Sequence, residues 1–243
     1  MTLAVRQPLS NRTAVVTGGT RGIGAAIARR LMADGATVLV TGASGRDRGP
    51  EGASFIAVDF CDRSALEAFA GELTARKVDI LVNNAGINRV APFADIKIDD
   101  FDQIHEVNLR AAFVLARAVI GGMQQRGDGR IVNITSIWGV IGKEYRGSYS
   151  ASKFGMDGLT AALSAETAAS GVLVNSVAPG FIDTELTRSV LGDKGIAELV
   201  ARVPIKRLGR PEEVASLVAW LVGPENTYLT GQSVVIDGGF SRV

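Results

Sequence analysis

Along this chain, short runs rich in Val, Ile and Thr alternate with longer stretches rich in Ala, and few folds accommodate such an alternation. The short runs predict strands at residues 14–17, 37–41, 55–58, 80–83, 130–135, 172–178 and 233–236. Most of these runs are apolar throughout, as in strands that are buried on both faces of a parallel sheet. The Ala-rich stretches predict helices at residues 23–34, 63–75, 101–125, 149–170 and 211–222. Strands that alternate with helices indicate a doubly wound α/β sheet of about seven strands, with helices on both faces.

One domain, residues 1–243, is expected. A length of 243 residues suits one α/β domain, or at most two small ones, and no repeat, low-complexity tract or Ser/Gly linker divides the sequence. The link between the second and third strands, residues 42–52, reads GASGRDRGPEG. Its glycines and proline disfavour a helix, so we expect a crossover of about minimal length there.

Composition and charge indicate a soluble protein of a reducing compartment. The 26 Lys and Arg residues nearly balance the 25 Asp and Glu residues, so we expect no binding to nucleic acid. No apolar run is long enough to span a membrane, and Arg6 and Pro8 interrupt what a signal peptide would need. Cys61 has no second cysteine to pair with and is interpreted as a core thiol, and His105 as a helix residue. We expect a cytoplasmic protein without a metal.

The first predicted strand runs directly into TGGTRGIG, residues 17–24. Gly18, Gly22 and Gly24 lie at the turn and at the start of the following helix. Missing side chains there allow a diphosphate to approach backbone N–H groups, and the helix dipole adds positive potential. The motif therefore predicts a dinucleotide site, the alternative being a glycine-rich turn without a ligand.

The stretch SYSASKFG, residues 148–155, places Tyr149 four residues before Lys153. On a helix this spacing brings a phenol and an ammonium onto one face. A nearby cation lowers the pKa of a phenol from about 10, which suits general acid–base catalysis. Taken alone, the pair is better explained as part of an ordinary solvated helix face.

Several motifs in a fixed order make the sequence, from about Thr13 to Val243, similar to the short-chain dehydrogenase/reductases, and among them to the 3-oxoacyl-(acyl carrier protein) reductase type. The motifs are TGGTRGIG at 17–24, NNAG at 83–86, Asn108 in EVNL, Ser136 in ITS, YSASK at 149–153 and PG at 179–180. The glycine spacing G-x-x-x-G-x-G differs from the commoner G-x-G-x-x-G. The resemblance implies a single-domain Rossmann fold.

The resemblance also implies a role for each motif residue. Ser136 would donate to the substrate carbonyl oxygen, Tyr149 would transfer the proton, and Lys153 would lower the pKa of Tyr149 and bind the nicotinamide ribose. Asn108 would support the lysine through a water-linked relay. The implied cofactor contacts are Gly18, Thr20, Arg21, Gly22, Ile23, Gly24, Asp59, Asn83, Ala85, Gly86, Tyr149, Lys153, Pro179, Gly180, Ile182 and Thr184.

The end of the second strand indicates which nicotinamide cofactor is preferred. Sites for NAD usually carry an acidic residue there, whereas residues 41–44 read TGAS. Arg21, Arg46 and Arg48 are close in sequence and suit a phosphate, so NADP(H) is favoured. Asp47 keeps NAD(H) open as an alternative, because a short loop could turn it inward.

The substrate site is less well defined by the sequence. The resemblance implies one wall between Ser136 and Tyr149 and a mobile lid over residues 181–204, with Gly192 and Gly195 as flexible points. The implied substrate contacts are Ser136, Trp138, Tyr145 and Tyr149. A 3-oxoacyl thioester is the expected substrate. The alternatives are a free small ketone, sugar, hydroxy acid or steroid-like alcohol, and a protein that binds a nucleotide without catalysis.

The resemblance implies two kinds of partner. Acyl carrier protein is possible, but two basic positions of its reductases fall here on Gly127 and Ser170, and only Arg126 and Arg130 are near enough to compensate. A homotetramer is implied, paired through the helix that begins at Tyr149 and the one that contains Asn108, and again through the C-terminal strand.

Overall fold

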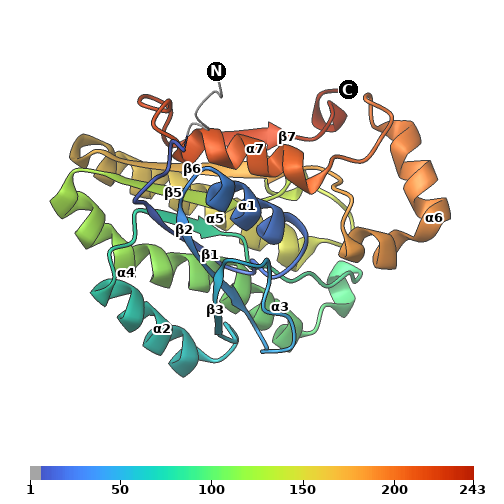
Figure 1. Cartoon of the computed structure of the whole chain (residues 1–243). Coiled ribbons are helices and arrows are strands. Elements are labelled where there is room, and N and C mark those ends of the chain that lie inside the picture. Colours follow the sequence, from blue (N-terminus) through green and yellow to red (C-terminus); the bar gives the residue numbers. More distant parts are fainter. Residues whose placement is uncertain (1–6) are drawn as a thin grey trace, which may run out of the picture.

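The computed structural model describes residues 7–243, and the strands within that range form one parallel sheet (Figure 1). The strands are β1 (Thr13–Val16), β2 (Thr37–Gly42), β3 (Ser54–Ala57), β4 (Ile80–Asn83), β5 (Gly129–Ile134), β6 (Val172–Pro179) and β7 (Ser233–Ile236). Their order is β3-β2-β1-β4-β5-β6-β7. The expected doubly wound sheet is confirmed, and no predicted strand boundary is wrong by more than one residue.

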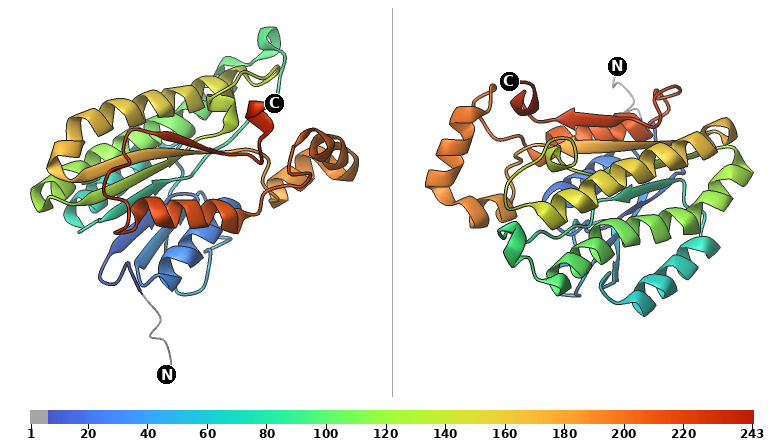
Figure 2. Two further views of the ribbon diagram at one scale, coloured as in Figure 1. Left: turned by 90° about the horizontal axis from the view of Figure 1, so that it is seen from above. Right: turned by 180° about the vertical axis from the view of Figure 1, so that it is seen from behind.

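Helices cover both faces of the sheet (Figure 2). The helices are α1 (Gly22–Ala33), α2 (Arg63–Ala75), α3 (Ile98–His105), α4 (Ala111–Arg126), α5 (Gly147–Thr167), α6 (Glu185–Arg202) and α7 (Pro211–Val222). α1 packs beside α7 on one face, and α2 packs beside α4, with α5 next to them, on the other. No helix within residues 7–243 has the length and apolar character that crossing a membrane requires.

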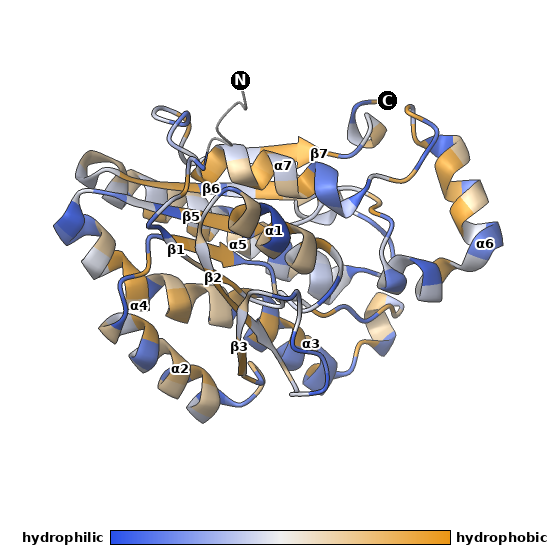
Figure 3. Ribbon diagram, viewed as in Figure 1, coloured by the Kyte–Doolittle hydropathy of each residue, from blue (hydrophilic) through white to orange (hydrophobic). Residues whose placement is uncertain are grey.

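The core consists of two apolar layers, one on each face of the sheet. Successive residues of a strand point to opposite faces. Val15 of β1 accordingly packs with the α2 and α4 side, whereas its neighbours Ala14 and Val16 pack with the α1 and α7 side. Because both faces are covered, the central strands are mostly apolar, and Figure 3 shows hydrophobic residues along the sheet and mixed hydropathy along the helices around it.

Two predicted segments differ from the structure. The helix expected at 101–125 begins earlier, at Ile98, and is interrupted by a π-helical turn, Glu106–Arg110, before α4. The expected lid loop, 181–204, is mostly the helix α6, with Gly192 in a left-handed conformation (φ 61°) that breaks the helix. The predicted flexible point is therefore a kink between two helical pieces.

The crossover between β2 and β3 contains no helix, as expected. Gly49 of this loop has φ 80°, and a Cβ atom at that position would lie 3.2 Å from the carbonyl oxygen of Gly19. The loop therefore packs directly on the glycine-rich turn after β1. Because the loop takes this direct path over the turn, few residues are needed to connect β2 to β3.

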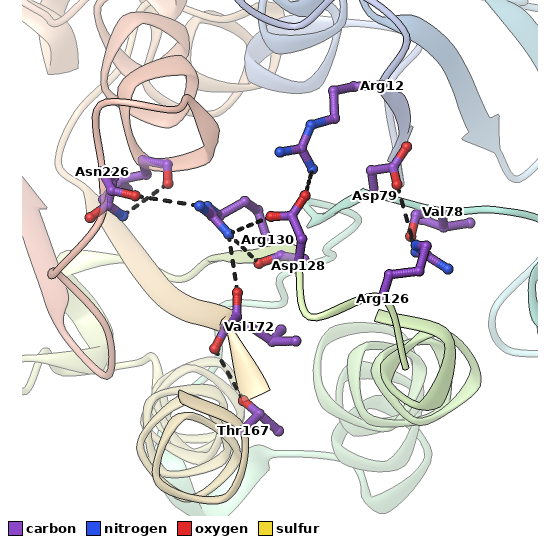
Figure 4. A network of polar contacts seen from close by, with 12 residues as sticks. Arg12, Val78, Asp79, Arg126, Asp128, Arg130, Thr167, Val172 and Asn226 are labelled. Atoms are coloured by element: carbon purple, nitrogen blue, oxygen red, sulfur yellow. Dashed lines mark hydrogen bonds and ion pairs between the residues drawn. The ribbon is translucent and has the colours of Figure 1, made fainter. Parts of the chain in front are cut away.

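A network of paired charges holds together the amino-terminal edge of the sheet (Figure 4). Arg130 is buried at the start of β5, where it pairs with Asp128 at 3.1 Å and donates to the carbonyl oxygens of Gly129 (2.9 Å) and Gly171 (3.4 Å). Arg12 pairs with the same Asp128. Arg126 donates to the Val78 carbonyl oxygen at 2.6 Å. Burial lowers the pKa of Arg130, and its partners compensate for that desolvation.

Replacement of Arg130 by Met should lower the free energy of unfolding by about 2 kcal/mol, because hydrogen bonds made by a buried charged group contribute about 1.5–3 kcal/mol. Urea unfolding measures the loss. Lys77→Met is the matched control, since Lys77 is an exposed cation paired with Asp79 of the same edge, and its loss should cost less than about 1 kcal/mol. Equal effects of the two substitutions would contradict the structural role of Arg130.

Candidate functional site

A cleft of about 500 Å³ opens at the carboxyl ends of the strands. It lies where the strand order reverses between β1 and β4, so loops leave the sheet there in opposite directions. The predicted cofactor residues that line it are Gly18, Thr20, Arg21, Gly22, Ile23, Gly24, Asp59, Ala85, Gly86, Tyr149, Lys153, Pro179, Gly180, Ile182 and Thr184. Ser136 lines the same cleft. The fold thus brings distant motifs to one place.

The turn after β1 is held against the turn after β4 by the Thr17 side chain. Thr17 Oγ1 accepts hydrogen bonds from the backbone N–H groups of Asn84 (2.9 Å) and Ala85 (3.0 Å). Gly18 has φ 60°, and a Cβ atom there would lie 2.9 Å from Ala85 Cα. Glycine is therefore required at this position by the approach of the two turns, in addition to any ligand.

Asn83 lies outside the cleft, which corrects its expected place under the cofactor. Its side chain is buried in the sheet and donates from Nδ2 to Asn133 Oδ1 at 2.9 Å. The next residue, Asn84, lines the cleft instead. Its Nδ2 donates to the carbonyl oxygens of Thr17 and Gly18, both at 3.0 Å. Because side chains alternate along a strand, two adjacent asparagines at its end point to opposite faces.

Ser136 and Tyr149 meet at the inner end of the cleft. Ser136 follows β5 and caps the 3₁₀ turn Ile137–Gly139, with its Oγ accepting from Trp138 N at 3.2 Å. Tyr149 lies in the first turn of α5, and both it and Ser136 line the cleft. Burial raises the pKa of Tyr149, while hydrogen bonding to Ser136 and the charge of Arg146 lower it. Burial is the largest of these effects, so the phenol keeps its proton.

Lys153 is buried one turn after Tyr149, with Nζ 5.6 Å from the phenol ring centroid. The ammonium donates to the carbonyl oxygen of Ile134 at 2.8 Å. Burial lowers the pKa of Lys153 to about 8. Arg146, and not Lys153, is the cation that lowers the pKa of Tyr149, so the expected effect of Lys153 on that pKa is not seen.

Asn108 lies at the π-helical turn that the sequence did not reveal. Its Oδ1 accepts from Ile87 N at 2.8 Å, and its Nδ2 donates to the Ile87 carbonyl oxygen and to Ser152 Oγ, both at 3.0 Å. A Cβ atom at Gly86 would lie 3.4 Å from Asn108 Oδ1 and 3.6 Å from Lys153 Nζ. Asn108, which does not line the cleft, and Lys153, which does, therefore both lie close to Gly86. Single-turn π-helices are frequent at functional sites.

The shape and chemistry of the cleft fit a dinucleotide. Gly22, with φ 54°, starts α1 at the cleft wall, so the first N–H groups of that helix face the space where a diphosphate would lie. Where β2 ends, the cleft is lined by Thr41, Gly42 and Ala43, none of them acidic. Asp47 accepts from Gly49 N at 3.0 Å within its own loop. Of the nearby cations, Arg21 lines the cleft.

Arg46 and Arg48 are exposed and lie outside the residues that line the cleft. Cys61 was expected in the core, and the structure shows it exposed at the cleft beside Asp59. Partial burial and Asp59 both raise the pKa of the Cys61 thiol, which disfavours the nucleophilic thiolate. His105 ends α3, as expected of a helix residue.

Three aromatic rings gather next to the inner end of the cleft. Trp138 lies 5.8 Å from Phe181 and 6.1 Å from Phe240, and the latter two rings are 5.0 Å apart, all in edge-to-face contact. Phe181 is the first residue of the expected lid, whereas Phe240, in the C-terminal turn, was not expected here. Tyr145 is 55% exposed and lies outside the cleft lining, contrary to its expected contact with the substrate.

Comparisons with known proteins give a consistent result. Residues 18–241 match the family model described as enoyl-(acyl carrier protein) reductase. The chain is 39% identical over 243 residues to the 3-oxoacyl-(acyl carrier protein) reductase of Vibrio cholerae, covering 97% of this chain and 99% of that protein. It is 38% identical to the acetoacetyl-CoA reductase of Cupriavidus necator, covering 95% and 98%.

Among solved structures, the chain is similar to a proposed NAD(P)-dependent gluconate 5-dehydrogenase from Beutenbergia cavernae, which was solved with NADP at low occupancy. The TM-score is 0.90 at 37% identity, covering 98% of this chain and 100% of the other. A proposed 2-deoxy-D-gluconate 3-dehydrogenase from Agrobacterium tumefaciens with bound NADP gives a TM-score of 0.89 at 34% identity, covering 98% and 99%.

Burial of the Lys153 ammonium should make the free energy of unfolding depend on pH. The pKa of Lys153 falls from 10.5 in the unfolded chain to about 8 in the folded protein. Between pH 8 and 10.5, the unfolded chain therefore keeps a proton on Lys153 that the folded protein has released. The free energy of unfolding should therefore rise with pH in this window, by up to about 3 kcal/mol relative to Lys153→Met. Urea unfolding of both cofactor-free proteins from pH 7 to about 10 measures the difference. A constant difference would contradict the burial of the charge.

Proposed function

Because the chain belongs to the short-chain dehydrogenase/reductase family, we propose that this oxidoreductase interconverts a ketone and a secondary alcohol with NADP(H), and that a 3-oxoacyl thioester is its substrate. The observation that carries this proposal is the meeting of Ser136, Tyr149 and Lys153 in one cleft beside a glycine-rich turn. A protein that only binds a nucleotide would have no use for all three side chains.

The protein's own residues provide an acid and an oxyanion site. Bound NADPH supplies the hydride for reduction. Tyr149 keeps its proton up to high pH, so it is ready to give it to the carbonyl oxygen. Ser136 is fixed beside it by the turn it caps and donates a second hydrogen bond to that oxygen as negative charge develops there. Lys153 and Asn108 lie close to Gly86, where they would hold the ribose of the bound cofactor.

NADP(H) is favoured over NAD(H) by charge. The 2′-phosphate would lie near the end of β2, where the cleft wall has no carboxylate and where Arg21 contributes a guanidinium. Asp47, the acidic residue that keeps NAD open in the sequence, is engaged by Gly49 N. The NADP bound to the two gluconate dehydrogenase structures supports the same choice.

A 3-oxoacyl thioester is supported by the Vibrio and Cupriavidus relatives, whose names specify such substrates. Recognition of acyl carrier protein has less support. Gly127 and Ser170 precede β5 and β6, so within one chain they lie at the edge of the sheet opposite the cleft. Arg126 and Arg130, which could have compensated, are engaged in the network of Figure 4. We therefore propose that the acyl chain and its carbonyl groups suffice for recognition.

The alternative substrate is a free hydroxy acid or sugar acid, with the same redox chemistry at Tyr149. The gluconate dehydrogenase structures support it. We also propose a homotetramer, since Phe113 of α4 and Phe154 of α5 are 50% and 48% exposed in the single chain. A solution mass of one chain would overturn the assembly without affecting the chemistry.

Purified protein should oxidise NADPH with acetoacetyl-N-acetylcysteamine, a neutral 3-oxoacyl thioester. It should not do so with crotonyl-N-acetylcysteamine, which offers a C=C bond instead of the ketone. Tyr149→Phe should lower kcat by about 100-fold or more, because proton transfer contributes about 10²–10⁴-fold, while NADPH affinity changes little. Tyr228→Phe, at a fully exposed tyrosine, is the control. Full turnover by Tyr149→Phe, or reduction of the crotonyl thioester alone, would contradict the proposal.

Ala43→Asp should shift the cofactor preference toward NADH. A carboxylate at the end of β2 would repel the 2′-phosphate of NADPH and accept from the 2′-hydroxyl of NADH. The ratio of kcat/KM values, NADPH over NADH, should fall by more than about tenfold, or about 1.4 kcal/mol. Ala43→Asn has nearly the same shape without the charge and should change the ratio much less. An unchanged ratio in Ala43→Asp would place the 2′-phosphate elsewhere.

A further inference from the structure

The C-terminal turn, Phe240–Arg242, is a part of the chain to which the proposed reaction gives no role. It lies beside the lid helix α6 (Figure 1 and Figure 2). The carboxylate of Asp237 holds the turn, since its oxygens accept from Gly239 N at 2.8 Å and from Ser241 N at 2.7 Å. The last residues of the chain therefore form a fixed turn and not a free tail.

The Phe240 ring closes a triangle of aromatic contacts with two segments that border the cleft. Its centroid lies 5.0 Å from that of Phe181 and 6.1 Å from that of Trp138, with interplanar angles of 89° and 88°. The Phe181 and Trp138 rings are themselves 5.8 Å apart. Edge-to-face pairs are a preferred arrangement of aromatic rings and add to the stabilisation from burial. Phe240 therefore fixes the Trp138 ring from the side of the C-terminal turn.

The C-terminal turn is itself anchored on the end of the lid. Arg202, the last residue of α6, places its guanidinium 5.8 Å from the Phe240 ring centroid. Ile205 N donates to the carbonyl oxygen of Gly238 at 3.2 Å. A Cβ atom at Gly238, which has φ 65°, would lie 2.6 Å from Ile205 Cγ2, so the two backbones approach closely. Phe240 thus offers Trp138 a surface that is held in place.

Trp138 connects this surface to the residue that meets the substrate. It belongs to the 3₁₀ turn Ile137–Gly139, which Ser136 caps. Trp138 N donates to Ser136 Oγ at 3.2 Å, so the Ser136 hydroxyl keeps its own proton for the substrate carbonyl oxygen. The same turn packs on α5, because a Cβ atom at Gly139 would lie 3.0 Å from Lys153 Cβ. A shift of Trp138 would therefore move Ser136 relative to α5.

From this continuous set of contacts, we propose that Phe240 is a positioning residue that sets the place of Ser136 through Trp138. The inference rests on the proposed function, because it concerns the serine that bonds the substrate carbonyl oxygen. Phe240 is not among the residues that line the cleft, so it acts through its neighbours and does not touch the substrate. A misplacement of about 1 Å at a reacting group can lower the rate by about 100-fold.

Phe240→Leu keeps an apolar side chain but removes the ring. It should lower kcat for acetoacetyl-N-acetylcysteamine by about tenfold, because Ser136 is held less well. The affinity for NADPH should change little, since the glycine-rich turn is built from other segments. Phe240→Tyr keeps the ring and should retain most of kcat. Val243→Ala, at a 93% exposed residue of the same C-terminal segment, is the matched control and should leave kcat unchanged.

The loss should depend on Ser136. In a Ser136→Ala background, Phe240→Leu should lower kcat by less than about threefold, because no hydroxyl remains to be positioned. A substitution that only loosened the fold would lower kcat equally in both backgrounds. Equal losses, or an unchanged kcat in Phe240→Leu alone, would overturn the role of Phe240 and leave the proposed function intact. A complete lack of ketone reduction by the unaltered protein would instead overturn the proposed function.

Fluorescence tests the contact with Trp138 without any turnover. The chain has two tryptophans, so Trp138 is the only emitter in Trp220→Phe protein. In that background, Phe240→Leu should raise the constant for acrylamide quenching, because the Trp138 ring loses a neighbour that shields and holds it. Val243→Ala should leave the constant unchanged. An unchanged constant in Phe240→Leu would show that Phe240 does not fix Trp138 and would overturn the inference.

Discussion

The contact between the turn after β1 and the turn after β4 is the constraint on which the cleft depends. At this seam the strand order reverses, so the two loops must leave the sheet side by side without filling the space between them. Thr17 bonds both backbone N–H groups of the second turn, and Gly18 allows the two backbones to approach. The start of α1 and the Gly86 floor are thereby fixed next to each other. The other residues that line the cleft are arranged around this contact between the two turns.

Buried cations at the two edges of the sheet differ in the number of hydrogen-bond acceptors around them. At the amino-terminal edge, Arg130 is buried but surrounded by acceptors, so its charge contributes to stability (Figure 4). At the carboxyl-terminal edge, Lys153 donates to one backbone carbonyl oxygen, and burial lowers its pKa to about 8. Desolvated groups that lack partners cost stability. The protein tolerates that cost at the edge where a ligand can supply the missing partners.

The sequence predicted those features that depend on local periodicity and on backbone chemistry. Apolar runs located every strand to within one residue, and the glycine-rich turn located the cleft. The sequence-based predictions failed where the role of a residue depends on which other segments of the chain pack against it. Gly192 disfavoured a helix in the lid, yet α6 forms around it with a kink. Asn83 and Asn84 could not be told apart until the strand's last residue was known, because one step along a strand reverses the face.

The electrostatics of the active site were the least predictable part. The spacing of Tyr149 and Lys153 correctly predicted that they share a helix face, but burial raises the pKa of one and lowers the pKa of the other. The sequence placed Arg146 in one wall of the expected substrate site and Phe181 in the lid. No pattern singled out Phe240, which meets Phe181 and Trp138 only through the fold. The sequence by itself determined the sheet and the glycine-rich turn, because these follow from local spacing. Only the tertiary structure decided which charges find partners, because desolvation and pairing depend on neighbours brought together from across the chain.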